Sequence, residues 1–128
     1  MISIAVVEDD QEYQKQLLQY IEQYGKEQEA QYKITVFQNG MNFLDDYKGD
    51  CDLIFMDIAM PHMDGLELSR KAREEYSDLQ IVIFSGYSDF SFAQRAIELG
   101  VTRYLTKPTN ARELIGILEE IEKNIQKP

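Results

Sequence analysis

Residues 53–84 read LIFMDIAMPHMDGLELSRKAREEYSDLQIVIF, a segment that begins and ends with a short apolar run. Neither run, 53–56 or 81–84, alternates between apolar and polar residues. Unbroken runs of this length are typical of strands covered on both faces, as in a parallel sheet. Between them Leu68, Ala72 and Tyr76 recur at four-residue spacing, which indicates a helix with one apolar side. The segment therefore predicts two parallel strands joined by a helix.

The same alternation continues on both sides of this unit. Residues 2–7 form a third apolar run, and residues 34–37 and 103–105 are weaker strand candidates. Four further helical patterns have as their apolar positions Tyr13, Leu17, Tyr20, Ile21 and Tyr24; Phe43, Leu44 and Tyr47; Phe92, Ala93, Ala96 and Ile97; and Leu114, Ile117, Leu118, Ile121 and Ile125. We expect these stripes to face the core. Five strands alternating with five helices predict a doubly wound α/β fold with a parallel sheet.

Local signals predict where several helices begin and end. Asp10 and Asn110 are expected to cap the first and last helices, and Glu113 can reach back to Asn110 as in a capping box. Gly25 and Gly100 are expected to end the first and fourth helices.

Composition limits the classes of function that this chain can have. Its 128 residues are the size of one domain, 1–128, and the formal net charge of −10 would repel nucleic acids and anionic membranes. No apolar run is long enough to cross a bilayer, and no secretion signal is recognisable, so we expect a cytoplasmic domain. The one cysteine, Cys51, is interpreted as a small apolar filler at a strand edge in preference to a reactive thiol.

Polar residues follow four of the predicted strands, at the ends where open α/β sheets bind ligands. They are the acidic stretch 8–10, then Asp57, Ser85 and Lys107. Taken singly, each has an ordinary structural explanation, such as a cap, a turn residue or a solvated charge. We expect all four to meet at one edge of the sheet, which is harder to explain without a ligand.

The chemistry of these groups favours a hard cation beside a nucleophile. Carboxylates from Asp9 and Asp57, with Glu8 behind them, would repel each other unless a cation neutralised them. Oxygen ligands without a His or Cys pair select Mg²⁺ over zinc. A carboxylate such as that of Asp57 can attack phosphorus, and Ser85 and Lys107 could then hold the phosphoryl oxygens.

Taken together, the motifs resemble the receiver family of two-component response regulators, and the resemblance covers essentially the whole chain. It rests on VVEDD (6–10), FMDIAMPHMDGLEL (55–68), IVIFSGYSDF (81–90) and YLTKP (104–108). The resemblance implies a flavodoxin-like (βα)₅ fold with strand order 2-1-3-4-5. It also implies a signalling domain, not an enzyme acting on other substrates, that takes a phosphoryl group from a sensor histidine kinase.

The resemblance assigns roles to single positions. Asp57 would be the phosphoacceptor and a Mg²⁺ ligand, together with Asp9 and the backbone carbonyl of Ala59. Glu8 would act in the outer shell of the metal. Lys107, with a cis bond expected before the following proline, would contact the phosphoryl group.

The resemblance also implies a conformational switch. Ser85 and Tyr104 would change the face made by the fourth helix, fifth strand and fifth helix, around Phe90 and Arg112. A homodimer could form through the same face. The sequence departs from the family's usual pattern at Gly86, where alanine is common, and at Glu8, where aspartate is common.

Rival functions fit the residues of this chain less well. A phosphohydrolase of the haloacid-dehalogenase type requires a second aspartate two residues after the nucleophile, where this chain has Ala59. An interaction module that no longer takes phosphate would not need Asp57, Ser85 and Lys107 together. A nucleotide-binding protein would carry a P-loop or GxGxxG motif, and the acidic residues 8–10 would repel the phosphate of a flavodoxin cofactor.

The chain is either a stand-alone regulator or the receiver of a longer protein. We favour the second interpretation, with a DNA-binding output domain after the receiver. Residues 84–90 resemble receivers fused to AraC-type transcription factors, whereas residues 37–57 resemble receivers fused to LytTR-type domains. Both kinds of output domain remain open.

Overall fold

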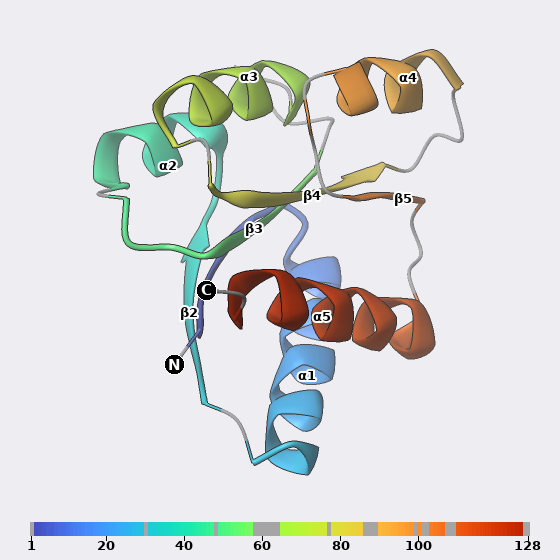
Figure 1. Cartoon of the computed structure of the whole chain (residues 1–128). Coiled ribbons are helices and arrows are strands. Elements are labelled where there is room, and N and C mark those ends of the chain that lie inside the picture. Colours follow the sequence, from blue (N-terminus) through green and yellow to red (C-terminus); the bar gives the residue numbers. More distant parts are fainter. Residues whose placement is uncertain are drawn as a thin grey trace.

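Strands and helices alternate along the chain in the computed structural model (Figure 1). The elements are β1 (Ile2–Val7), α1 (Gln11–Glu27), β2 (Tyr32–Phe37), α2 (Gly40–Asp46), β3 (Leu53–Asp57), α3 (Gly65–Glu75), β4 (Gln80–Ser85), α4 (Phe90–Glu98), β5 (Arg103–Thr106) and α5 (Ala111–Gln126). The structure describes residues 2–29, 31–47, 49–57, 65–76, 78–85, 90–98, 100, 103–106 and 110–126. Side chains are described for these residues except 65, 90–93, 106, 125 and 126. The order confirms the predicted alternation.

The strands form one parallel sheet in the order β2-β1-β3-β4-β5, which confirms the predicted strand order. From β1 the chain first adds β2 on one side and then returns to place β3 on the other. The topological switch point of the sheet therefore lies between β1 and β3. Open α/β sheets bind ligands at this point, just beyond the carboxyl ends of the strands.

Burial explains why some strands were easier to predict than others. β3 is buried at every residue and β4 at all but its first, so both are unbroken apolar runs. β2 lies at the sheet edge and is only partly buried, with Val36 38% exposed. It begins at Tyr32, two residues before the predicted start, because Tyr32 and Ile34 both pack against the core while Lys33 between them is exposed.

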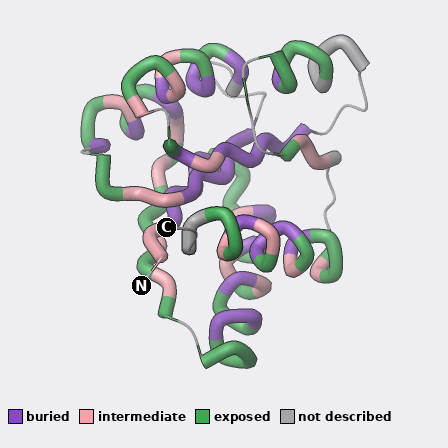
Figure 2. The backbone as a smooth tube through the Cα atoms, in the orientation of Figure 1, coloured by how far each residue is buried: buried purple, intermediate pink, exposed green. Residues whose placement is uncertain are grey.

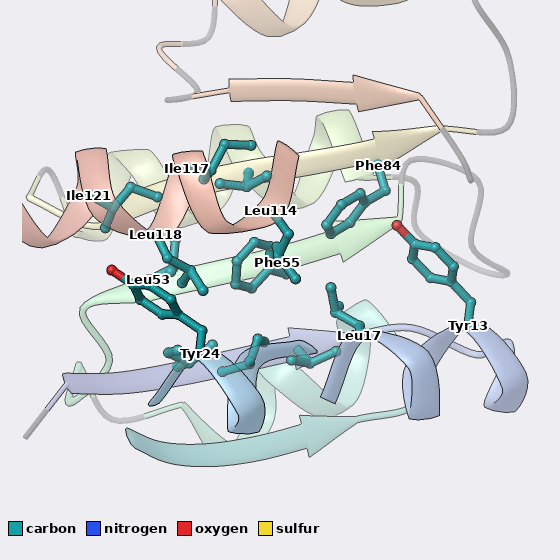
Figure 3. Packing of buried hydrophobic residues seen from close by; sticks show 14 residues of the cluster. Tyr13, Leu17, Tyr24, Leu53, Phe55, Phe84, Leu114, Ile117, Leu118 and Ile121 are labelled. Atoms are coloured by element: carbon teal, nitrogen blue, oxygen red, sulfur yellow. The ribbon is translucent and has the colours of Figure 1, made fainter. Parts of the chain in front are cut away.

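The hydrophobic core is divided by the sheet into two layers (Figures 1 and 2). α1 and α5 cover one face of the sheet, and Figure 3 shows how their side chains meet those of β3 and β4. α2, α3 and α4 cover the other face. The helices bury one side each, and no helix among the described residues has the length and apolar character needed to span a bilayer.

Side-chain caps fix the starts of three helices. The Asp10 carboxylate accepts hydrogen bonds from the backbone N–H groups of Glu12 and Tyr13 at 3.0 and 3.3 Å, which confirms the predicted cap of α1. Asn110 accepts from the Glu113 N–H at 2.8 Å, which confirms the predicted cap of α5. The cap of α2 was not predicted: its N-cap residue is Asn39, whose side chain accepts from a backbone N–H at 2.8 Å.

Two sequence predictions about helices are wrong. Gly25 does not end α1 but lies buried inside it, and the helix runs on to Glu27. A glycine within a helix costs only about 1 kcal/mol, and here the chain reverses later, through Glu29 at φ 52°. Ile97 was expected to face the core but is 71% exposed on α4, where Ala96 is the buried neighbour. Gly100 does follow the end of α4 as predicted, at φ 78°.

Cys51 is half-buried beside β3 and packs against the core layer under α2 and α3, as the filler interpretation expects. Burial, and after it the carboxylates of Asp50 and Asp52, raise the pKa of its thiol to about 11, against the opposing effect of Lys33. A rise of about two pKa units from an ordinary thiol leaves roughly 100-fold less thiolate near neutral pH. We therefore expect Cys51 to react slowly with iodoacetamide at pH 8, and its rate to keep rising through pH 10.

The measurement is the alkylation rate against pH, for native protein, urea-unfolded protein and a small reference thiol. The unfolded chain should react at the reference rate. A native rate that levels off by pH 9 would show instead that Cys51 is an ordinary reactive thiol.

Candidate functional site

Three carboxylates meet at the carboxyl edge of the sheet, at the topological switch point. Glu8 and Asp9 directly follow β1, and Asp57 is the last residue of β3, the strand next to β1. One carboxylate oxygen from each residue lies within 4.8 Å of the other two. Glu8 and Asp57 are 2% and 7% exposed, whereas Asp9 is exposed. The structure thus brings together the three acidic residues that the sequence analysis placed at one site.

Hydrogen bonds from neighbouring elements hold the acidic loop 8–10 in place. The Glu8 N–H donates to the carbonyl of Phe37 at 3.1 Å, which extends the pairing of β1 with β2 by one residue. The Asp10 N–H donates to the Glu8 carboxylate at 3.4 Å, while the Asp10 side chain caps α1. The loop is therefore anchored to β2 on one side and to α1 on the other.

One residue that the sequence analysis did not single out also contacts this loop. The side-chain amide of Gln14 donates to the backbone carbonyl of Glu8 at 3.0 Å. A lone glutamine within a helical pattern carries no signal by itself, so only the structure identifies this contact.

Ser85 and Tyr104 lie near one another in the sheet. Ser85 ends β4 and is fully buried, and the residue before it pairs with Asp57 across the β3–β4 ladder. Tyr104 is half-buried in β5, pairs with Ile83, and packs against the core layer of α2, α3 and α4. Because side chains alternate along a strand, Ser85 shares the face of Ile83, which belongs to that same layer. The two predicted switch residues therefore face the same side of the sheet.

Two predicted site residues lie outside the described residues. These are Ala59 and Lys107, and the departure at Gly86 and the expected cis bond before Pro108 also lie there. Their places at the site stay predictions. Of the residues expected around the switch face, Phe90 begins α4 and Arg112 is exposed in the first turn of α5.

The chemistry of the described cluster suits a hard divalent cation. All three of its side chains offer carboxylate oxygens, the donors that Mg²⁺ and Ca²⁺ prefer. Two of the three are buried, so water screens their mutual repulsion only in part. The arrangement places a buried aspartate, Asp57, where a cation could be held beside it.

Comparisons with known proteins identify the family of this chain. Over residues 4–119 the chain matches the response regulator receiver domain family. YesN of Bacillus subtilis, an uncharacterized transcriptional regulatory protein, is 41% identical over 69 residues, which cover 54% of this chain and 19% of YesN. CpdR of Brucella abortus, a response regulator receiver protein, is 30% identical over 122 residues, which cover 94% of this chain and 97% of CpdR.

Solved structures show the same fold. A two-component response regulator from Clostridium difficile superposes with a TM-score of 0.87 at 22% identity, over 99% of this chain and 100% of that one. The chain spans half or less of the length of several other curated relatives that it matches. The family match over nearly the whole chain, together with the fold, establishes that this chain belongs to the response regulator receiver domains of two-component signalling systems.

Proposed function

We propose that this domain accepts a phosphoryl group from a sensor histidine kinase onto Asp57, in a reaction that requires Mg²⁺. Receiver domains of two-component systems partner with histidine kinases, which supports the choice of donor. The observation that carries the proposal is the cluster of Glu8, Asp9 and Asp57, with carboxylate oxygens within 4.8 Å at the switch point of the sheet.

Receiver domains generally use Mg²⁺ at an acidic site, and the donors in this cluster fit that ion. Asp9 and Asp57 would bind it directly, Glu8 would act through its outer shell, and Ala59 would add its backbone carbonyl. When bound, Mg²⁺ supplies positive charge that offsets the carboxylates and the phosphoryl oxygens. The anchoring of loop 8–10 to β2 and α1 limits how far the carboxylates of Glu8 and Asp9 can move apart.

Asp57 would act as the nucleophile. A bond would form between its carboxylate oxygen and phosphorus, while the bond from phosphorus to the kinase histidine nitrogen breaks and its electron pair stays on that nitrogen. Lys107 would donate to one phosphoryl oxygen and Ser85 to another. The domain would catalyse only its own phosphorylation and dephosphorylation.

The signal would leave through the face made by α4, β5 and α5. Ser85, drawn toward the phosphoryl group, would free space for the ring of Tyr104 on the same side of the sheet. The coupling of these two side chains is supported by their position, since Ser85 and Tyr104 face the same side of the sheet. Residues 1–128 would form one receiver domain in the cytoplasm, able to dimerise through this face and attached to an effector domain that regulates transcription, as the name of YesN suggests for that relative.

The experiment that tests the proposal is incubation with acetyl phosphate, with Mg²⁺ or with EDTA, followed by intact-mass analysis. We expect one phosphoryl adduct that forms only with Mg²⁺ and is lost at alkaline pH, because acyl phosphates hydrolyse there. An adduct that forms equally in EDTA would contradict the metal requirement. A stable adduct on a serine would contradict the choice of Asp57.

A further inference from the structure

Gln14 links α1 to the loop that carries the cation-site carboxylates. It is half-buried in the first two turns of the helix, and its Nε2 donates to the Glu8 carbonyl oxygen at 3.0 Å. That carbonyl belongs to the peptide bond between Glu8 and Asp9. Because a peptide unit is planar, holding its oxygen fixes the orientation of the plane from which the Asp9 backbone departs.

The neighbours of Asp9 are held from both sides. On one side the Glu8 N–H donates to Phe37 at 3.1 Å. On the other side Asp10 is held by its N–H bond to the Glu8 carboxylate, by its cap of α1, and by the Gln14 N–H, which donates to its carbonyl at 3.0 Å. Asp9 itself is exposed and lies between these anchors. The Gln14 amide adds a side-chain hydrogen bond to the peptide that joins Glu8 to Asp9.

We infer that Gln14 is a positioning residue for the cation site. By holding the peptide between Glu8 and Asp9, its amide keeps the Asp9 carboxylate within reach of Glu8 and Asp57. This inference rests on the proposed function, because only the proposed function gives the three carboxylates a shared cation. Gln14 would not touch the ion or the phosphoryl group.

A purely structural role for Gln14 predicts a different result. If the amide only supported the start of α1, its removal would lower stability equally with and without Mg²⁺. If it positions Asp9, its removal must weaken Mg²⁺ binding itself. Loss of one hydrogen bond of ordinary strength is expected to weaken Mg²⁺ binding by about three- to tenfold.

The test compares Gln14→Met, which keeps the length of the side chain but has no donor, with Gln19→Met. Gln19 is an exposed glutamine further along the same helix, so it controls for the change of side chain in α1. Mg²⁺ affinity is measured by isothermal titration calorimetry, and urea unfolding is measured with Mg²⁺ and with EDTA. Gln14→Asn, which keeps the amide but is too short to reach, is a second variant in case Gln14→Met does not fold.

We expect both Gln14 variants to bind Mg²⁺ about three- to tenfold more weakly than the wild type, and Gln19→Met to bind as the wild type does. The extra stability that Mg²⁺ gives should shrink in the Gln14 variants. Wild-type affinity in folded Gln14 variants would overturn the inference while leaving the proposed function intact. Failure of the wild type itself to bind Mg²⁺ would overturn the proposed function.

Discussion

Asp57→Asn is expected to reduce the phosphoryl adduct formed with acetyl phosphate and Mg²⁺ below detection. Asparagine has nearly the shape of aspartate, but its neutral amide is a poor nucleophile toward phosphorus and a weaker ligand for a hard cation. Asp57 is the one carboxylate of β3, and it is 7% exposed at the end of that strand. Intact-mass analysis after incubation measures the result.

Asp10→Asn is the matched control, because it removes one charge from the same acidic loop. Its amide oxygen can still accept from the N–H groups of Glu12 and Tyr13, so the cap of α1 should persist. This variant should form the adduct. Equal adduct on wild type and Asp57→Asn would show that another residue accepts the phosphoryl group.

The same substitution should also change how stability depends on the metal. In EDTA, Asp57→Asn should be more stable than the wild type by about 1 kcal/mol, because it removes one charge from three carboxylates that lie close together. Mg²⁺ at about ten times its dissociation constant should stabilise the wild type by about 1.4 kcal/mol, and the variant by much less. Urea unfolding in EDTA and in Mg²⁺ separates the two effects. A variant that is less stable than the wild type in EDTA would mean that Asp57 has a structural role.

The parts of this fold that were predictable from sequence are those in which one physical effect dominates. β1, β3 and β4 are buried on both faces, so apolar residues alone mark them. β2 required knowledge of its place at the edge, where Tyr32 and Ile34 are covered and Lys33 is not. The helix end predicted at Gly25 was wrong because the preference of glycine for helix ends is weak compared with burial against the core.

The candidate site was also predictable only in part. Glu8, Asp9 and Asp57 were predictable because each lies at a strand end, and the ends of parallel strands share one edge. Outside the site, the exposure of Ile97 depends on how α4 is rotated over the sheet, which a short apolar pattern does not specify. The contact of Gln14 depends on the path of loop 8–10, and no spacing rule links a helical glutamine to a carbonyl six residues earlier.

Phe55→Ala is expected to cause a large loss of stability. Phe55 is 1% exposed in the centre of β3, and its ring stacks on that of Phe84 with centroids 5.5 Å apart (Figure 3). Phe84 in turn forms a T-shaped pair with Tyr13 from α1, with ring centroids 5.4 Å apart. Truncation would remove this apolar contact and leave a cavity, at a cost of about 3–5 kcal/mol. Since small domains are stable by only about 5–15 kcal/mol, the variant should be close to unfolding.

Urea unfolding followed by circular dichroism measures this loss, and Met41→Ala is the control. Met41 is 45% exposed on α2, so its truncation should change the free energy of unfolding by less than about 0.5 kcal/mol. A loss below about 1 kcal/mol for Phe55→Ala would mean that the layer under α1 and α5 can collapse around the missing ring.

Because Phe55 and Asp57 share β3, the phosphoryl adduct of Phe55→Ala must be assayed at a temperature where the variant is folded. At that temperature the phosphoryl adduct should still form, since Phe55 is buried in the centre of β3 and takes no part in the chemistry at the end of that strand.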